Sequence, residues 1–160
     1  MAIAAEPDVL IADEPTTAVD VTTEALILEL LAHLSDELGL AVLLITHDLA
    51  VAADFCDEIS VMYAGRVVEH APVGKMFADP QHPYTRALLN STVTLDLDPD
   101  HPIPAIGGQS PLPGELPGGC PPCPAAIPGW ATHVPPTVMT EQERLVECVH
   151  YSAGGEWLAP

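Results

Sequence analysis

Two short runs of apolar residues, each ended by polar side chains, constrain the fold of this chain most. Residues 9–12 (VLIA) are followed by Asp13-Glu14-Pro15, and residues 40–45 (LAVLLI) lead to Thr46-His47-Asp48. Such runs are typical of strands buried on both faces, as in parallel sheets. Ligand sites of open parallel sheets lie at the carboxyl ends of the strands. We therefore expect the carboxylates after the first run and the histidine after the second to cluster at one edge of a sheet.

The segment between the two runs has the periodicity of a helix. Residues 22–38 predict an amphipathic helix closed by Gly39, with its apolar stripe on the sheet. The apolar positions fall at i, i+4, i+7 and i+11: Ile27, Leu31, Leu34 and Leu38. Residues 48–55 predict a short helix and residues 58–63 a third strand. This alternation predicts one parallel sheet that contains all three strands and is covered by helices.

The second half of the chain changes character after Ser91. Before it, Ala64-Gly65 predicts a turn into an antiparallel partner strand over 66–70, and residues 73–78 and 83–91 predict helices. Beyond it, most of the 18 prolines and 11 glycines break periodicity. We expect one compact domain over 1–91 and a loop-rich extension over 92–160. Residues 92–139 should lack a packed core, and 140–149 should form one short helix or strand.

The charge balance excludes some partners. Four Lys/Arg against 23 Asp/Glu give a net charge of -19, which repels nucleic acid and anionic lipid surfaces. The acidic composition also suggests adaptation to high salt, which screens self-repulsion. Without an apolar run long enough to span a bilayer or a leader-like N-terminus, we expect a cytoplasmic protein.

Several ordered motifs between residues 4 and 91 carry a resemblance to a known family. Residues 9–16 (VLIADEPT) resemble the Walker B segment of ABC ATPases, residues 17–20 (TAVD) the D-loop, and residues 44–48 (LITHD) the switch-histidine segment. Residues 62–69 (MYAGRVVE) and 77–89 (FADPQHPYTRALL) resemble segments of the peptide-importer branch. The chain is thus similar to the C-terminal part of an oligopeptide/dipeptide ABC transporter ATP-binding protein. The resemblance implies a fold of the α/β class: a partial P-loop NTPase (ABC-type) parallel sheet with flanking helices, then a Pro/Gly-rich, largely irregular tail.

The resemblance also implies roles for four residues in ATP hydrolysis. Asp13 would hold Mg²⁺, because hard dications prefer carboxylate and water oxygens. Glu14 would act as the general base on the attacking water, and His47 would contact the terminal phosphate of ATP. Asp20 would lie at the interface with a second ATPase subunit. A simpler interpretation makes Asp20 only the cap of the following helix, and the two interpretations can coexist.

The same resemblance implies partners for this chain and shows which family motifs its sequence does not contain. Partners would be a second ABC ATPase subunit and two membrane permeases, which would place the chain peripherally at the cytosolic face of the membrane. ATP hydrolysis would be coupled to peptide transport. The sequence contains no G-x-x-x-x-G-K-[ST] loop, glutamine loop or Ser-Gly-Gly signature, so we expect a truncated product without ATPase activity of its own. The alternative is a non-catalytic remnant or interaction fragment.

The cysteines of the tail allow a third hypothesis, a small metal-binding module. Residues 116–120 (LPGGC), Cys123 and Cys148 resemble the cysteine-bearing extension of the peptide importers, whose ligand sets resemble iron–sulfur sites. Here Cys120 and Cys123 enclose only two prolines, and Trp130 stands about where a third cysteine is expected. The resemblance therefore implies an iron–sulfur cluster or zinc on Cys120, Cys123 and Cys148, with His133 or His150 as substitute ligands.

Overall fold

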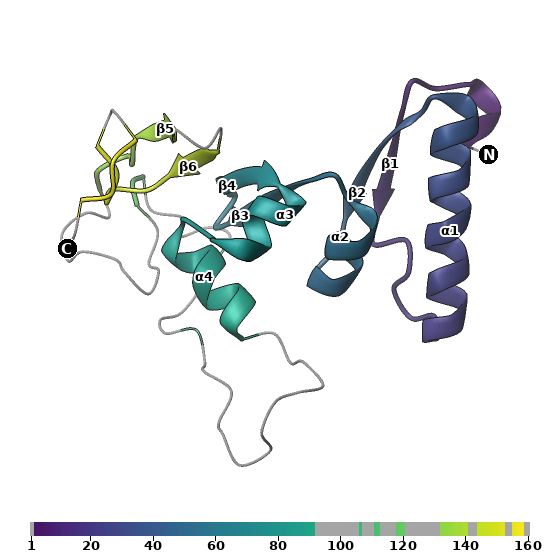
Figure 1. Ribbon diagram of the computed structural model, residues 1–160, viewed down its shortest axis with the longest axis horizontal. Coiled ribbons are helices and arrows are strands. Elements are labelled where there is room, and N and C mark those ends of the chain that lie inside the picture. Colours follow the sequence, from purple (N-terminus) through teal and green to yellow (C-terminus); the bar gives the residue numbers. More distant parts are fainter. Residues whose placement is uncertain are drawn as a thin grey trace, which may run out of the picture. The chain divides into compact units, whose positions relative to one another are not determined.

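The computed structural model describes residues 2–91, 106, 111–112, 118–120, 132–140, 144–152 and 155–158. The chain divides into two compact units, Met1–Cys56 and Asp57–Pro160, which are described separately below (Figure 1). The expected boundary between a domain over 1–91 and an extension over 92–160 stays a prediction. Among the described helices, none is both long and apolar enough to cross a bilayer.

The first unit is a helix-covered pair of parallel strands. Val9–Asp13 (β1) and Ala41–Ile45 (β2) pair in register from Val9↔Ala41 to Asp13↔Ile45. Figure 1 shows the long helix α1 lying alongside both strands. The predicted strand–helix–strand order is confirmed. Its remaining elements are η1 (Ala2–Ala5), α1 (Val21–Leu38) and α2 (Leu49–Phe55).

Helix α1 begins and ends where the sequence predicts. Asp20 caps its first turn, and Gly39 closes it in the left-handed region at φ 63°, where its N–H donates to the carbonyl of Ser35. The helix packs against β2. Three of the four predicted stripe residues are half-buried, but Leu38 is 57% exposed. Leu38 is the last helical residue, at the point where the chain reverses at Gly39.

The prediction that residues 58–63 join the parallel sheet is wrong. Glu58–Tyr63 (β3) pairs antiparallel with Arg66–Pro72 (β4), in a second sheet of order β3-β4-β6-β5. The predicted antiparallel hairpin with its turn at Ala64-Gly65 is confirmed, and it explains why 58–63 does not join the parallel sheet. Ala64 and Gly65 have φ of 50° and 76°, as a tight hairpin turn requires, so β3 finds its partner in the next strand along the chain.

The second unit joins this hairpin to part of the tail. The two predicted helices are confirmed as α3 (Val73–Ala78) and α4 (Pro83–Asn90). Leu145–Glu147 (β6) pairs antiparallel with β4 and with Thr137–Met139 (β5), which confirms a strand within 140–149. Buried side chains gather under these strands: Val138, Val146, Cys148 and Tyr151. The expectation that residues 92–139 lack a packed core is wrong for β5, whereas residues 92–105 and 121–131 lie outside the described residues.

Candidate active site

The structure brings the candidate base and the candidate switch histidine together. Glu14 directly follows β1, and its N–H donates to the carbonyl of Ile45 at the end of β2. His47 follows β2 by two residues. Its Nδ1 lies 2.8 Å from Oε1 of Glu14. The predicted clustering of Glu14 and His47 at the carboxyl ends of two paired strands is confirmed.

Glu14 is held in a defined position by its own turn. The hydroxyl of Thr17 donates to Oε2 of Glu14 at 3.0 Å, and the N–H of Thr17 donates to the carbonyl of Glu14. The φ of Glu14 is 48°, a left-handed conformation that non-glycine residues adopt uncommonly. Such strained residues are concentrated at functional sites. Thr17 was expected only as part of the D-loop-like segment 17–20, although a hydroxyl three residues after the carboxylate is the signal that could have indicated this contact.

The hydrogen bond between the two side chains shifts both pKa values. The pKa of Glu14 is lowered, first by the hydrogen bond with His47 and then by the hydrogen bond from Thr17. The pKa of His47 is raised, first by the hydrogen bond with Glu14 and then by the negative charge of Glu14. Each side chain therefore favours the charged form of the other. Both remain accessible to water, with exposed side-chain fractions of 84% for His47 and 37% for Glu14.

Loop hydrogen bonds fix the backbone on which His47 sits. The N–H of Asp48 donates to the hydroxyl of Thr46 at 3.0 Å. The carboxylate of Asp48 in turn caps α2, accepting from the N–H groups of Ala50 and Val51. His47 thus lies between the end of β2 and a capped helix start, with its ring in solvent.

The other two predicted site residues have different surroundings. Asp13 is the last residue of β1 and is exposed. Asp20 accepts hydrogen bonds from the N–H groups of Thr22 and Thr23 and from the hydroxyl of Thr23, at 2.7 to 3.1 Å. The side-chain hydrogen bond from Thr23 is the main reason that the pKa of Asp20 is lowered. The capping interpretation of Asp20 is confirmed, and its place at a subunit interface stays a prediction.

The sequence is similar to those of known ATP-binding proteins. Residues 68–126 match the family model "Oligopeptide/dipeptide transporter, C-terminal region". A putative peptide import ATP-binding protein of Brucella melitensis is 52% identical over 75% of this chain. The oligopeptide transport ATP-binding protein AppD of Bacillus subtilis is 43% identical over 97% of it. The chain is thus a relative of the ATP-binding subunits of peptide-transporting ABC systems.

The relationship covers only part of the related subunits. The chain spans 36% of the length of the Brucella protein and 48% of the length of AppD. Among solved structures, CbiO1 from Clostridium perfringens, described as part of an ABC transporter complex, is 36% identical over 48% of this chain, with a TM-score of 0.45.

A buried carboxylate anchors the segment 77–89, which resembles a segment of the peptide-importer branch. Glu69 on β4 is fully buried, and its two oxygens accept from the N–H groups of Gln81 and His82 at 2.9 and 2.8 Å. The hydroxyl of Tyr151 donates to Gln81 Oε1 at 2.8 Å, and the guanidinium of Arg144 donates to the carbonyl of Asp79. The residues between α3 and α4 therefore hold the end of the tail against β4. The sequence motif at 77–89 did not predict this role.

The cysteines of the tail are partly described. Cys120 and Cys148 are buried, and Cys123 lies outside the described residues. The N–H of Cys120 donates to the carbonyl of His133, and a Cβ on Gly119 would lie 2.3 Å from the nitrogen of His133, so only glycine fits there. Within the described ranges, no three His, Cys, Asp or Glu side chains are grouped to hold a metal. Metal binding by Cys120, Cys123 and Cys148 stays a prediction.

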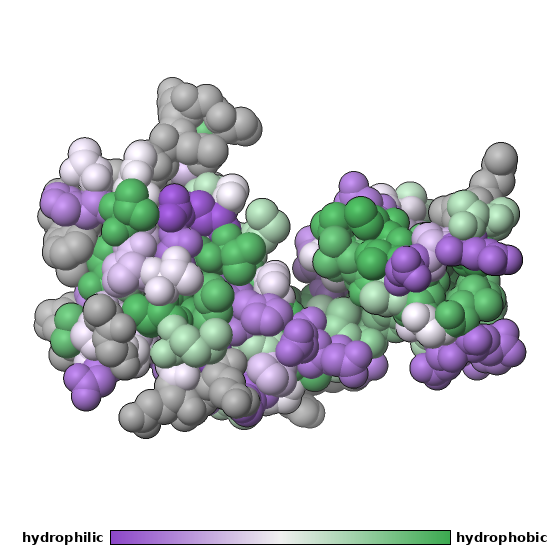
Figure 2. All heavy atoms as spheres, turned by 90° about the horizontal axis from the view of Figure 1, so that it is seen from above, coloured by the Kyte–Doolittle hydropathy of each residue, from purple (hydrophilic) through white to green (hydrophobic). Residues whose placement is uncertain are grey.

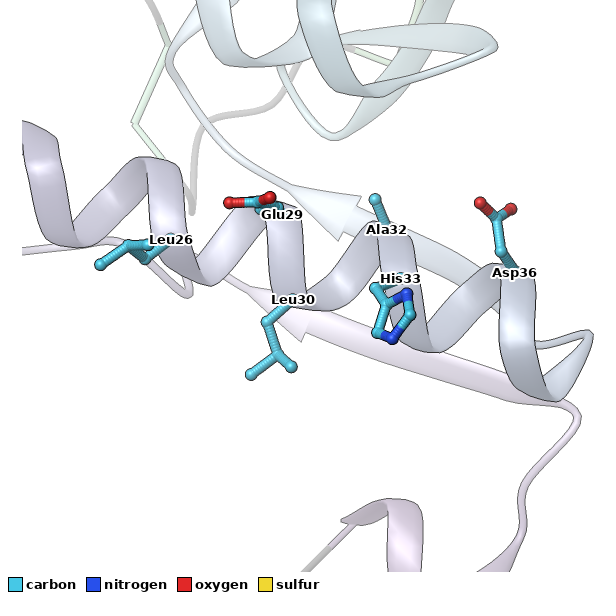
Figure 3. Close-up of a pocket in the computed structure, with 6 residues that line it drawn as sticks. All are labelled: Leu26, Glu29, Leu30, Ala32, His33 and Asp36. Atoms are coloured by element: carbon cyan, nitrogen blue, oxygen red, sulfur yellow. The ribbon is translucent and has the colours of Figure 1, made fainter.

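A shallow hollow along α1 contains none of the candidate residues. It is lined by Leu26, Glu29, Leu30, Ala32, His33 and Asp36 (Figure 3). All six belong to one helix. Ligand sites are concave and combine groups from several elements, so the hollow is not a second active-site candidate.

Proposed function

We propose that this chain supplies the Walker B carboxylates and the switch histidine of an ABC-type ATPase that uses ATP and Mg²⁺ to drive oligopeptide or dipeptide import. The contact between His47 and Glu14 at 2.8 Å is the observation that supports this most. It joins a carboxylate and an imidazole at the carboxyl ends of two parallel strands, where ligands of such sheets bind.

The geometry suits the activation of water beside a phosphate. Because the pKa of Glu14 is lowered, its carboxylate is unprotonated at neutral pH and able to accept a proton from water. Each oxygen uses one lone pair, toward His47 and toward Thr17, and a carboxylate has further acceptor positions for water. His47, with its raised pKa, offers a partly protonated ring beside the base, which suits contact with a phosphate oxygen.

Asp13 fits the metal-binding role. An exposed carboxylate next to the base is the ligand type that Mg²⁺ accepts together with water. When bound, the ion neutralises charge on the phosphate oxygens. Asp13 would then bind the metal ion, and Glu14 would accept a proton from the attacking water.

The partners in this proposal are those of an importer. Asp20, already fixed by its capping bonds, would face a second ATPase subunit, and the assembly would contact two permease subunits at the cytosolic face of the membrane. A glycine-rich loop with backbone N–H groups and a lysine is needed to hold the triphosphate. The sequence shown contains no such loop, so hydrolysis requires the part of an ATPase domain that carries it.

A fusion protein tests the proposal. The part of AppD that carries its glycine-rich loop, cut before its counterpart of Val9, is joined to this chain, and ATP turnover is measured with and without Mg²⁺. We expect Mg²⁺-dependent turnover that Glu14→Gln abolishes while ATP binding is kept. Glu37→Gln is the control, since Glu37 pairs with His33 on the exposed face of α1. Full turnover by the Glu14→Gln fusion would refute Glu14 as the base.

A further inference from the structure

Two side chains hold the carboxylate of Glu14, one at each oxygen. Nδ1 of His47 lies 2.8 Å from Oε1, and the hydroxyl of Thr17 donates to Oε2 at 3.0 Å. The last torsion of a glutamate side chain has broad minima, so a single hydrogen bond leaves the carboxylate able to turn. Bonds to both oxygens fix the plane of the carboxylate, and with it the direction of the remaining lone pairs.

The hydroxyl of Thr17 reaches Oε2 because the turn after β1 is compact. The N–H of Thr17 donates to the carbonyl of Glu14 at 3.2 Å. Glu14 and Ala18 both have left-handed backbone conformations, with φ of 48° and 65°, which non-glycine residues adopt uncommonly. The turn runs from the end of β1 to Asp20, which caps α1. The hydroxyl therefore belongs to a segment that is anchored at both ends.

Thr17 and His47 differ as hydrogen-bond donors. Nδ1 of His47 can donate to Glu14 only in the protonated ring or in one of the two neutral tautomers. In the proposed function His47 also contacts the terminal phosphate of ATP, so its proton has two competing acceptors. The hydroxyl of Thr17 keeps its proton at any working pH. Thr17 is thus the contact that continues to hold Glu14 when the bonding of His47 changes.

The hydrogen bond from Thr17 is exposed to water. Figure 2 shows hydrophilic side chains beside apolar ones on the surface of the first unit. Thr17 is exposed, and the side chain of Glu14 has an exposed fraction of 37%. Water can replace a hydrogen bond in such a place, so the bond contributes little net stability. Its loss should change the orientation of Glu14 more than the folding of the unit.

We propose that Thr17 is a positioning residue for the general base: its hydroxyl holds Oε2 of Glu14, which leaves Oε1, beside His47, to accept the proton of the attacking water. The inference rests on the proposed function. Glu14 takes the proton, and Thr17 keeps its own. The same hydrogen bond is the second cause, after the bond with His47, that lowers the pKa of Glu14, so it also keeps the carboxylate unprotonated.

A titration of the full chain tests the contact without any enzymatic readout. Thr17→Val removes the hydroxyl and nearly keeps the shape, and ¹³C spectra follow the carboxyl of Glu14. We expect the midpoint of Glu14 to rise toward the ordinary 4.5 in Thr17→Val and to stay low in Thr17→Ser. Thr22→Val is the matched control, since Thr22 is exposed and is not among the groups that shift the pKa of Glu14. An unchanged midpoint in Thr17→Val, or an equal rise in Thr22→Val, would overturn the inference.

The AppD fusion described above supplies the kinetic test. We expect Thr17→Val and Thr17→Ala to lower kcat about tenfold while the Kd for ATP is kept, and Thr17→Ser to recover most of the rate. The acid limb of the kcat profile should move to higher pH in Thr17→Val. Thr22→Val should match the original fusion in both respects.

The outcomes separate this inference from the proposed function. If Glu14→Gln abolishes turnover but Thr17→Val and Thr17→Ala do not lower kcat, only the inference fails. It also fails if the loss lies in ATP binding alone, or if Thr17→Ser is as slow as Thr17→Val. If Glu14→Gln keeps full turnover, the proposed function is wrong and the role of Thr17 falls with it.

Discussion

Nδ1 of His47 lies 2.8 Å from Oε1 of Glu14, although the two residues are 33 positions apart in the chain. The contact depends on the register of β1 and β2, in which Asp13 stands opposite Ile45. A slip of one residue would turn the strand's side chains to the opposite face and separate the pair. The site therefore depends on the register in which these two strands pair.

The titration of His47 should depend on Glu14. Because its pKa is raised above 6.5 by the hydrogen bond with Glu14, the imidazole should lose its proton at higher pH than an ordinary histidine. The associated stabilisation is fully present below the unfolded value of 6.5 and is lost as pH rises through the folded pKa. We expect ¹H–¹⁵N spectra to show the midpoint returning toward 6.5 in Glu14→Gln. An unchanged midpoint would contradict the contact, and Glu37→Gln should leave it unaffected.

The isolated chain should not hydrolyse ATP at a measurable rate. In the proposed function Asp13 and Glu14 would supply a metal ligand and a base, but a triphosphate approaching a chain of net charge -19 meets repulsion with no preorganised N–H cradle in this sequence to offset it. A phosphate-release assay on the purified chain measures this directly. Glu14-dependent turnover by the chain alone would show that the glycine-rich loop is dispensable.

The sequence predicted those parts of the site that depend on short stretches of neighbouring residues. Uninterrupted apolar runs fixed the two strands, and the polar residues that follow them had to meet once the strands paired in parallel. Asp20 and Gly39 marked the ends of α1 through capping chemistry, which depends on neighbouring residues only.

What the sequence did not predict depends on contacts between distant segments. Residues 58–63 (EISVMY) predict a strand but do not name its partner. The alternation of Glu58, Ile59, Ser60 and Val61 and the tight turn at Ala64-Gly65 are the local signals that favour the antiparallel pairing. The role of Glu69 could not be inferred, since its two hydrogen bonds go to backbone N–H groups, which carry no signal in the side chains of Gln81 and His82.

Removing the cap of α1 should destabilise the first unit. Asp20→Ala deletes the acceptor of the Thr22 and Thr23 N–H groups, which leaves helix donors to water alone. We expect a lower urea midpoint for Asp20→Ala and a value close to the original for Asp20→Asn, which keeps an acceptor oxygen. Asp36→Ala is the control, because an acidic residue near a helix C-terminus does not favour the helix. Equal midpoints for Asp20→Ala and Asp36→Ala would contradict the capping role.

The buried carboxylate of Glu69 should be needed for the second unit to fold tightly. Glu69→Gln replaces one accepting oxygen by an NH₂ group that faces a backbone N–H, so one donor loses its partner in a buried place. We expect a loss of about 1.5 to 3 kcal/mol in the free energy of unfolding, with faster amide exchange at Gln81 and His82. Glu58→Gln on the neighbouring strand, where the side chain is 61% exposed, should cost little. A Glu69→Gln protein as stable as the Glu58→Gln protein would rule out this role for the carboxylate.

Acid should loosen the second unit through His82. Burial is the main reason that the pKa of His82 falls from 6.5 to about 4; the nearby His150 also lowers it, and a hydrogen bond with the backbone of Glu147 opposes both. The neutral ring is needed because its Nδ1 accepts from the N–H of Tyr84. The folded pKa lies below the unfolded one, so the stabilisation is present above pH 6.5 and is lost as pH falls toward about 4. A difference of about 2.5 pKa units corresponds to a loss of about 3 kcal/mol.

Urea denaturation of the full chain at pH 7, 5.5 and 4.5, followed by tryptophan fluorescence, to which Trp157 beside Tyr151 contributes, measures this loss. The acid sensitivity should be smaller in His82→Asn, because asparagine does not titrate here and its side-chain oxygen can accept from the N–H of Tyr84 as a helix cap. The difference in stability between the original chain and His82→Asn should therefore shift in favour of His82→Asn as the pH falls. If the two proteins lose stability in parallel between pH 7 and 4.5, His82 is not the group that responds, and the carboxylates of this strongly acidic chain account for the whole effect.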